Sequence, residues 1–339
     1  MGFTVETWEP GYGSASRDDL DEVQGATVDA SVEVDPETWA PIRPHPGSAP
    51  SELVFVDGVQ RIDCRLWIDT PQGSALGLCT TIGAGAVRCI PGRAEVIDTR
   101  VERAVFTSPE AVQRRDAPGG AGDHPGLGDE VLAATGAGEP IRYRVRPVRG
   151  VEESATYQAI NDAMADLEEA VSEALATEGE LVVYDGPLRS RRHLNGAGYV
   201  KTQRIQYLDG PTQAVVARLG PGERTPLFAI GDPRPRWSWY LRLPVNQAHA
   251  LDGVVRVELP RVDGAGVNDA AARADAISAA LPRFASEPHR EARAPQNLYP
   301  IAGLEHQLRR RLGDPHVLER ALRRASLGAD ATRRSRWSA

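Results

Sequence analysis

Two aspartates follow apolar runs in the same way. Residues 53–56 and 181–184 are each rich in Val, Leu and aromatic side chains, which is typical of a strand buried on both faces. Asp57 ends the first run, Asp185 ends the second, and a glycine follows each. Asp-Gly is a common hairpin turn, whereas a buried carboxylate must be paired, hydrogen-bonded or bound to a metal. Each aspartate is therefore a turn residue or a ligand, and the repetition of the pattern favours a ligand.

Side by side, the two strands would bring these carboxylates to one edge of a sheet. Hard oxygen ligands from separate elements can hold two divalent cations about 4 Å apart. Such ions stabilise the attacking and leaving oxygens of a phosphodiester, and the water that they bind is the nucleophile. Asp57 and Asp185 thus predict a two-metal phosphodiesterase site.

A third carboxylate is expected from a helix over residues 152–177. Its apolar residues fall on one stripe, opposite an acidic face. At about 100° per residue, Glu168 lies roughly 60° from the centre of the stripe and Glu169 roughly 160° from it. Glu168 is the predicted ligand if the helix packs on the sheet, and otherwise it belongs to a solubilising face.

Basic residues follow the second aspartate. Arg191 and Arg192 lie in an arginine-rich stretch, and Lys201 ends a short strand-like run. These side chains are predicted to bind a phosphate backbone beside the metal site, because arginine offers forked donors to phosphate oxygens. Such binding would be largely independent of sequence and would weaken as salt rises. The alternative is an exposed loop without a ligand.

Two further features have both a functional and a structural interpretation. Trp237, Trp239 and Tyr240 could stack single-stranded bases, although aromatic residues in strands are more often part of the core. His306 lies at the start of a helix after Pro300 and is a weak ligand candidate on its own.

Composition limits the classes of protein. The chain has 339 residues, 41% of them hydrophobic, and a net charge of −8, which argues against a uniformly basic nucleic-acid-binding protein but leaves room for a local basic groove. There is no apolar stretch long enough to span a bilayer and no signal-peptide pattern, so we expect a soluble cytoplasmic protein without membrane association. Cys64, Cys79 and Cys89 lack metal-binding spacing, and we expect them to be reduced and packed.

The expected organisation is a lead-in and Pro-rich linker over residues 1–50, one domain over 51–326 and a disordered tail over 327–339. Within the domain we expect a β-rich region to about residue 106, a surface loop over 114–138, three later strands and two C-terminal helices. The strands are expected over 228–232, 237–243 and 254–259, and the helices over 269–281 and, rich in arginine, from about 300 through 324.

The order of these motifs resembles the NurA nuclease family. The similarity runs from about Leu53 to Arg311. Its most specific pieces are the Phe-Val-Asp-Gly at residues 55–58, the Val-Tyr-Asp-Gly-Pro-Leu at 183–188, the Gly-Tyr-Val-Lys at 198–201 and residues 298–306.

This resemblance implies an α/β fold with an RNase H-like mixed central sheet flanked by helices, with β-rich and helical additions. It further implies manganese-dependent (or magnesium-dependent) exo- and endonuclease activity on DNA, a homodimer, and a HerA-type hexameric translocase as partner in end processing, repair or anti-phage defence. By this similarity Asp57, Asp185 and His306 match metal-binding positions, Glu168 is chosen for the intervening acidic position, and Tyr240 matches an active-site tyrosine.

Two departures from the family pattern bear on catalysis. Val59 and Pro187 replace the usual small polar residue after each Asp-Gly, and Glu153, Glu168 and Glu169 all compete for the acidic position. The alternative function is therefore a catalytically inactive NurA-like adaptor that caps a translocase ring or binds DNA ends. A ribonuclease of the same fold is a further alternative.

Overall fold

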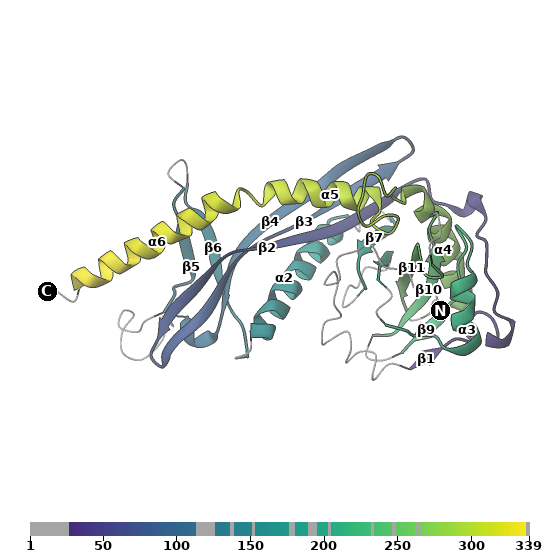
Figure 1. Cartoon of the computed structure of the whole chain (residues 1–339), viewed down its shortest axis with the longest axis horizontal. Helices are drawn as coiled ribbons and strands as arrows, with labels where there is room; N and C mark the ends of the chain where they lie inside the picture. The colour runs from purple at the N-terminus through teal and green to yellow at the C-terminus, as the bar shows by residue number, and fades with distance from the viewer. Residues whose placement is uncertain are drawn as a thin grey trace. The chain divides into compact units, whose positions relative to one another are not determined.

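Figure 1 shows the computed structural model of the chain. The residues that it describes are 27–112, 126–135, 139–150, 153–175, 180–188, 195–202, 205–231, 234–245, 249–261, 264 and 266–336, with side chains through 327. The strands are β1 Val28–Asp29, β2 Leu53–Thr70, β3 Gly73–Ile90, β4 Arg93–Thr107, β5 Glu130–Ala133, β6 Ile141–Pro147, β7 Val182–Asp185, β8 Gly196–Val200, β9 Phe228–Ile230, β10 Arg236–Arg242 and β11 Val254–Pro260. The longer helices are α2 Glu153–Glu173, α3 Gly210–Arg218, α4 Val267–Ala280, α5 Tyr299–Arg311 and α6 Pro315–Arg336.

The strands form one mixed sheet in the order β1-β9-β10-β11-β8-β7-β2-β3-β4-β6-β5. Two-residue connections join β2 to β3 and β3 to β4, as in hairpins. In contrast, β7 pairs parallel to β2 and β8 pairs parallel to β7. A three-strand meander followed by parallel strands beside its first strand is the RNase H-like arrangement, so the predicted α/β fold class is confirmed.

The chain divides into two compact units, and the divisions fall inside continuous elements. The first unit contains residues 1–57, 86–97 and 172–304, and the second contains 58–85, 98–171 and 305–339. Strand β2 continues from one unit into the other at Asp57, and helix α5 does so at Leu304. The predicted division into a lead-in, one domain and a tail stays a prediction.

The first unit has a core on the α3 side of its strands. Aromatic residues of β9 and β10 form its centre: the Phe228 and Tyr240 rings are stacked with centroids 5.8 Å apart. Trp39 belongs to the same cluster, and its indole N–H donates to the carbonyls of Ala30 and Val34 at 3.1 Å. Trp39 thus anchors the segment before the Pro-rich stretch in this core.

The second unit packs helices against the meander. Cys79 and Tyr143 of the sheet share a core cluster with Ala321 and Leu322 of α6. Helix α2 lies against β2, where the side-chain amide of Gln60 donates to Asn161 Oδ1 at 2.8 Å. The three cysteines are free and packed, as predicted.

At Asp57 the structure excludes the turn alternative, because strand β2 passes through Asp57 and Gly58 without a turn. The structure also corrects two expectations. Strand β5 lies inside the predicted loop 114–138 and pairs with β6. Neither of these two strands was predicted from the sequence. Gly313, with a φ of 85°, separates the expected single arginine-rich helix into α5 and α6. Helix α6 continues through Arg336, and no described helix is long and apolar enough to cross a membrane.

Candidate metal centre

Parallel pairing of β2 and β7 sets the positions of the two predicted aspartates. Phe55 is opposite Val183 in the register of the two strands. Residues two apart in a strand share a face, so Asp57 follows Phe55 and Asp185 follows Val183 on that face. Asp57 is 5% exposed, and the Asp185 side chain is 17% exposed. The carboxylates therefore emerge on one face at the C-terminal end of β7, as the repeated pattern predicted.

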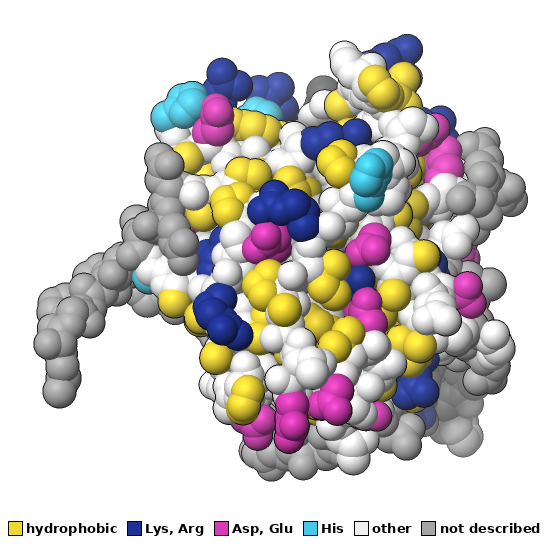
Figure 2. All heavy atoms as spheres, turned by 90° about the vertical axis from the view of Figure 1, so that its right-hand side faces the viewer, with side chains coloured by type: hydrophobic (Ala, Val, Ile, Leu, Met, Phe, Trp, Pro, Cys, Tyr) yellow, Lys and Arg dark blue, Asp and Glu magenta, His cyan; other side chains and the backbone are white. Residues whose placement is uncertain are grey.

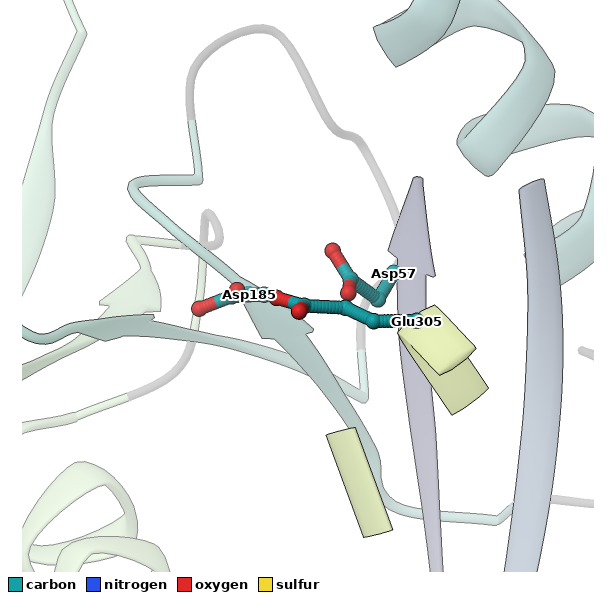
Figure 3. A group of neighbouring side chains, drawn as sticks. All are labelled: Asp57, Asp185 and Glu305. Carbon is teal, nitrogen blue, oxygen red and sulfur yellow. The ribbon is translucent and has the colours of Figure 1, made fainter. Parts of the chain in front are cut away.

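The third carboxylate of this group comes from α5. One carboxylate oxygen from each of Asp57, Asp185 and Glu305 lies within 4.8 Å of the other two. Figure 3 shows the three side chains pointing toward one another from β2, β7 and the helix. Glu305 directly follows Leu304, the last residue of the first unit, and helix α5 continues through both residues without a break. The sequence analysis missed Glu305, although it stands beside the predicted ligand His306.

A lysine and an asparagine support Asp185. The ammonium of Lys201 donates to Asp185 Oδ2 and to Asn297 Oδ1, both at 2.6 Å. Lys201 is 6% exposed and Asn297 is fully buried. The ammonium offsets part of the repulsion that three neighbouring carboxylates exert on one another. Lys201 thus contacts the acidic group directly, and its predicted contact with a phosphate backbone stays a prediction.

Lys201 is also the only lysine in the sequence, whereas the chain uses arginine at every other basic position apart from histidine. An ammonium is compact and can direct its donors at two oxygens in a tight space, while a planar guanidinium needs more room. A compact ammonium therefore suits this position, where it reaches Asp185 Oδ2 and Asn297 Oδ1 at once.

The segment before α5 is fixed by the same sheet. Tyr199, opposite Asp185 in the register of β7 and β8, donates its hydroxyl to the carbonyl of Gln296 at 2.7 Å. Complete burial, with the nearby Asp185 charge, raises the pKa of Tyr199 well above its ordinary value, which keeps the hydroxyl protonated as a donor. Residues 296 and 297 are thereby held against β8, the strand that Lys201 directly follows.

The two glycines after the aspartates are required for different reasons. Gly186 has a φ of 101°, a backbone conformation that favours glycine and ends β7. Gly58 instead leaves room for α2, because a Cβ there would lie 2.5 Å from Glu168 Oε1 and 2.8 Å from Met164 Cγ.

Glu168 is buried, 3% exposed, against Gly58. Successive residues of a strand face opposite sides, so Glu168 approaches the face of β2 opposite to that of Asp57. It is not a member of the acidic group found among the described residues. Glu153 forms an exposed ion pair with Arg65 at 2.8 Å, and Glu169 is half-buried.

Tyr240 and His306, the remaining predicted site residues that the structure describes, are not members of the acidic group. Tyr240 is 2% exposed in the α3-side core, and its N–H donates to Thr225 Oγ1 at 3.0 Å. Burial raises its pKa. Trp237 and Trp239 are also buried, so the core interpretation holds for all three aromatic residues. His306 is exposed on α5, and Arg191 and Arg192 lie outside the described residues.

The three carboxylates are chemically suited to a divalent cation. Mg²⁺ and Mn²⁺ prefer oxygen ligands, and at metal–oxygen distances of about 2.0–2.1 Å opposite ligands of one ion are about 4 Å apart. The mutual limit of 4.8 Å between ligand atoms is compatible with that separation. Asp57, Asp185 and Glu305 can therefore hold a metal ion.

No family model and no curated protein matches the sequence. Among solved structures, the crystal structure of the NurA nuclease from Sulfolobus solfataricus matches with a TM-score of 0.44 and 13% identity, covering 81% of this chain and 85% of that chain. The crystal structure of endonuclease V from Bacillus subtilis matches with a TM-score of 0.28 and 10% identity, covering 83% of this chain and 84% of that chain. The first of these is a member of the family that the sequence motifs resemble.

Proposed function

We propose that this protein is a metal-dependent nuclease that hydrolyses phosphodiester bonds of DNA. The observation that carries the proposal is the acidic group of Asp57, Asp185 and Glu305, with one oxygen of each within 4.8 Å of the others. Three converging carboxylates with an ion-paired lysine beside them are costly to assemble unless they bind a cation.

Asp57, Asp185 and Glu305 would hold the metal. When bound, divalent cations supply Lewis acidity that activates water and stabilises the leaving oxygen of a phosphodiester. Lys201 holds Asp185 in place, and Asn297 holds Lys201 through its side-chain carbonyl. A carboxylate that is fixed in this way loses less conformational entropy when it becomes a ligand.

The finer parts of the proposal rest on the motif resemblance. They are DNA as the substrate, two Mn²⁺ or Mg²⁺ ions, a homodimer, and a HerA-type hexameric translocase as partner in end processing, repair or anti-phage defence. Glu168, Tyr240 and His306 remain proposed active-site residues on the same ground, with His306 outside the set of side chains that would hold the metal. The burial of Glu168 beside Gly58 and of Tyr240 in the core supports structural roles for these two.

The test is cleavage of end-labelled single- and double-stranded DNA, and of RNA of the same sequence, with Mn²⁺, Mg²⁺ or EDTA. We expect metal-dependent cutting of DNA by the wild type. Asp57→Asn and Asp185→Asn should each lower the rate by more than about 100-fold, because even residues behind metal ligands contribute about 10–100-fold. Asp162→Asn, at an exposed carboxylate of α2, is the matched control and should cut like the wild type.

Absence of cutting by the folded wild type with every metal, including in the presence of a HerA-type translocase, would overturn the nuclease proposal and leave the adaptor. Faster cutting of RNA than of DNA would overturn the choice of substrate.

A further inference from the structure

The C-terminal part of the chain is basic in an acidic protein. Residues 305–339 contain nine arginines against four carboxylates, a net of five positive side chains, while the whole chain carries a net charge of −8. The face shown in Figure 2, in contrast, has acidic and basic side chains interspersed among hydrophobic ones. A protein with net negative charge repels a polyanion such as DNA, so a polyanion binds it where positive charge is locally in excess.

Three of these arginines form a consecutive run at the end of α5. Arg309, Arg310 and Arg311 are all exposed, and none has a carboxylate partner among the described residues. Elsewhere in this segment, Arg323 is paired with Glu319 at 2.7 Å. We call Arg309, Arg310 and Arg311 the α5 arginine surface.

Arginines in the last turn of a helix often serve only to bind its terminal carbonyls. At the two residues that follow α5, this role is filled from the sheet of the second unit. Arg61 donates to the carbonyls of Gly313 and Leu312, at 2.8 and 3.3 Å, and Arg103 donates to that of Leu312 at 3.2 Å. The α5 arginine surface is therefore not needed to bind the carbonyls just after the helix.

The surface begins one turn beyond the acidic group. Arg309 follows Glu305 by four residues, which places both on the same side of the helix, about 6 Å apart along its axis. The buried residues Leu308 and Leu312 hold α5 in place. A nucleic-acid strand whose phosphate lies at the carboxylates would reach Arg309 with its adjoining backbone.

We propose that the α5 arginine surface binds backbone phosphates of a DNA strand that is engaged at the acidic group. The proposal rests on the proposed function for the chemistry at Glu305, while DNA binding by the arginines is measured without cleavage. The contacts are to phosphate, so they position the strand and do not select its sequence.

The experiment measures binding of a fluorescent 30-nucleotide single strand and its duplex to the full chain in EDTA, at a series of salt concentrations. The triple variant Arg309→Gln, Arg310→Gln, Arg311→Gln should lower the slope of log K against log salt by about one to two for the duplex, because Arg311 lies about 200° around the helix from Arg309 and one strand cannot reach all three. Each lost phosphate contact removes about 0.9 from that slope for duplex and about 0.7 for single strands. The corresponding Arg→Lys variant should keep the slope, because the charge remains.

A control triple variant changes net charge by the same amount at exposed, ion-paired arginines. Arg93→Gln, Arg142→Gln and Arg290→Gln remove the partners of Glu95, Glu130 and Glu287, at 2.7, 3.6 and 3.9 Å. This control should bind DNA with the wild-type slope. An α5 variant with the wild-type slope, or a control that loses as much, would overturn the proposal.

The two proposals fail in distinguishable ways. A wild type that never cleaves, but whose DNA binding depends on the α5 arginine surface, would overturn the nuclease and keep this surface. A wild type that cleaves, with a salt slope unaffected by the α5 substitutions, would do the reverse.

Discussion

Glu305 and His306 are neighbours on α5 with opposite surroundings. Glu305 is half-buried and contributes an oxygen to the acidic group, whereas His306 is exposed. Successive residues of a helix are rotated by about 100°, so only one of two neighbours can face a given site. The motif resemblance selected the histidine, and the geometry favours the glutamate.

This pair gives a prediction at the scale of single residues. Glu305→Gln should raise the Mg²⁺ dissociation constant by at least about 10-fold, because it removes a charged ligand. His306→Gln should leave that constant unchanged. Mg²⁺ binding can be followed in ¹⁵N-lysine-labelled protein, because Lys201 is the single lysine and its Nζ lies 2.6 Å from Asp185 Oδ2. Weaker binding in His306→Gln alone would support the ligand that the resemblance selected.

At the scale of elements, a buried charge cluster joins β10 and β11 to Leu188, which follows β7. Glu258 is fully buried and accepts from Arg236 Nε at 2.9 Å, from Arg256 and from the N–H of Leu188 at 3.0 Å. Burial alone would raise the pKa of Glu258, but the two guanidinium groups and the Leu188 N–H lower it overall. The cluster thereby fixes Leu188, three residues after Asp185.

We predict that Glu258→Gln lowers the free energy of unfolding at pH 7 by about 3–5 kcal/mol, because it leaves buried guanidinium charges uncompensated. A carboxylate whose pKa is lower in the folded than in the unfolded protein stabilises the fold at pH values above its unfolded-state pKa. That stabilisation is lost as the pH falls through the folded-state pKa. The difference between wild type and variant should therefore shrink below about pH 4.5, the ordinary value for Glu258. Urea unfolding at pH 7 and pH 4 measures it.

The control is Glu95→Gln, which breaks the exposed pair with Arg93 at 2.7 Å and should cost less than about 1 kcal/mol. Equal losses in the two variants, or a difference that does not depend on pH, would contradict the account of the cluster.

At the scale of the whole molecule, the acidic group exists only in the folded chain. Asp57, Asp185 and Glu305 are far apart in sequence, so unfolding separates the ligands and releases the ion. A ligand that binds only the native state stabilises it by about 2.7 kcal/mol at 100 times its dissociation constant.

Mn²⁺ should therefore raise the thermal unfolding temperature of the wild type and leave that of the Asp57→Asn, Asp185→Asn double variant unchanged. Differential scanning calorimetry with and without the ion measures both. An equal rise in the two proteins would mean that the ion binds elsewhere.

Neighbouring residues in the sequence specify the local features of this site. Apolar runs before Asp57 and Asp185 specify buried strands, and helical periodicity specifies α2, because both patterns depend on neighbouring residues. The sequence also predicted that the two aspartates emerge together, since strands that end in the same way bring their ends together when they pair in parallel.

Long-range packing selects the side chains that join the aspartates. Glu168 has the periodicity of a ligand but meets β2 on the side of Gly58, while Glu305 and Lys201 approach Asp57 and Asp185 from segments distant in sequence. Periodicity says which face of a helix is buried, and long-range packing decides what that face is buried against. The electrostatic partners of a carboxylate are set by that packing, so no local pattern could have identified them.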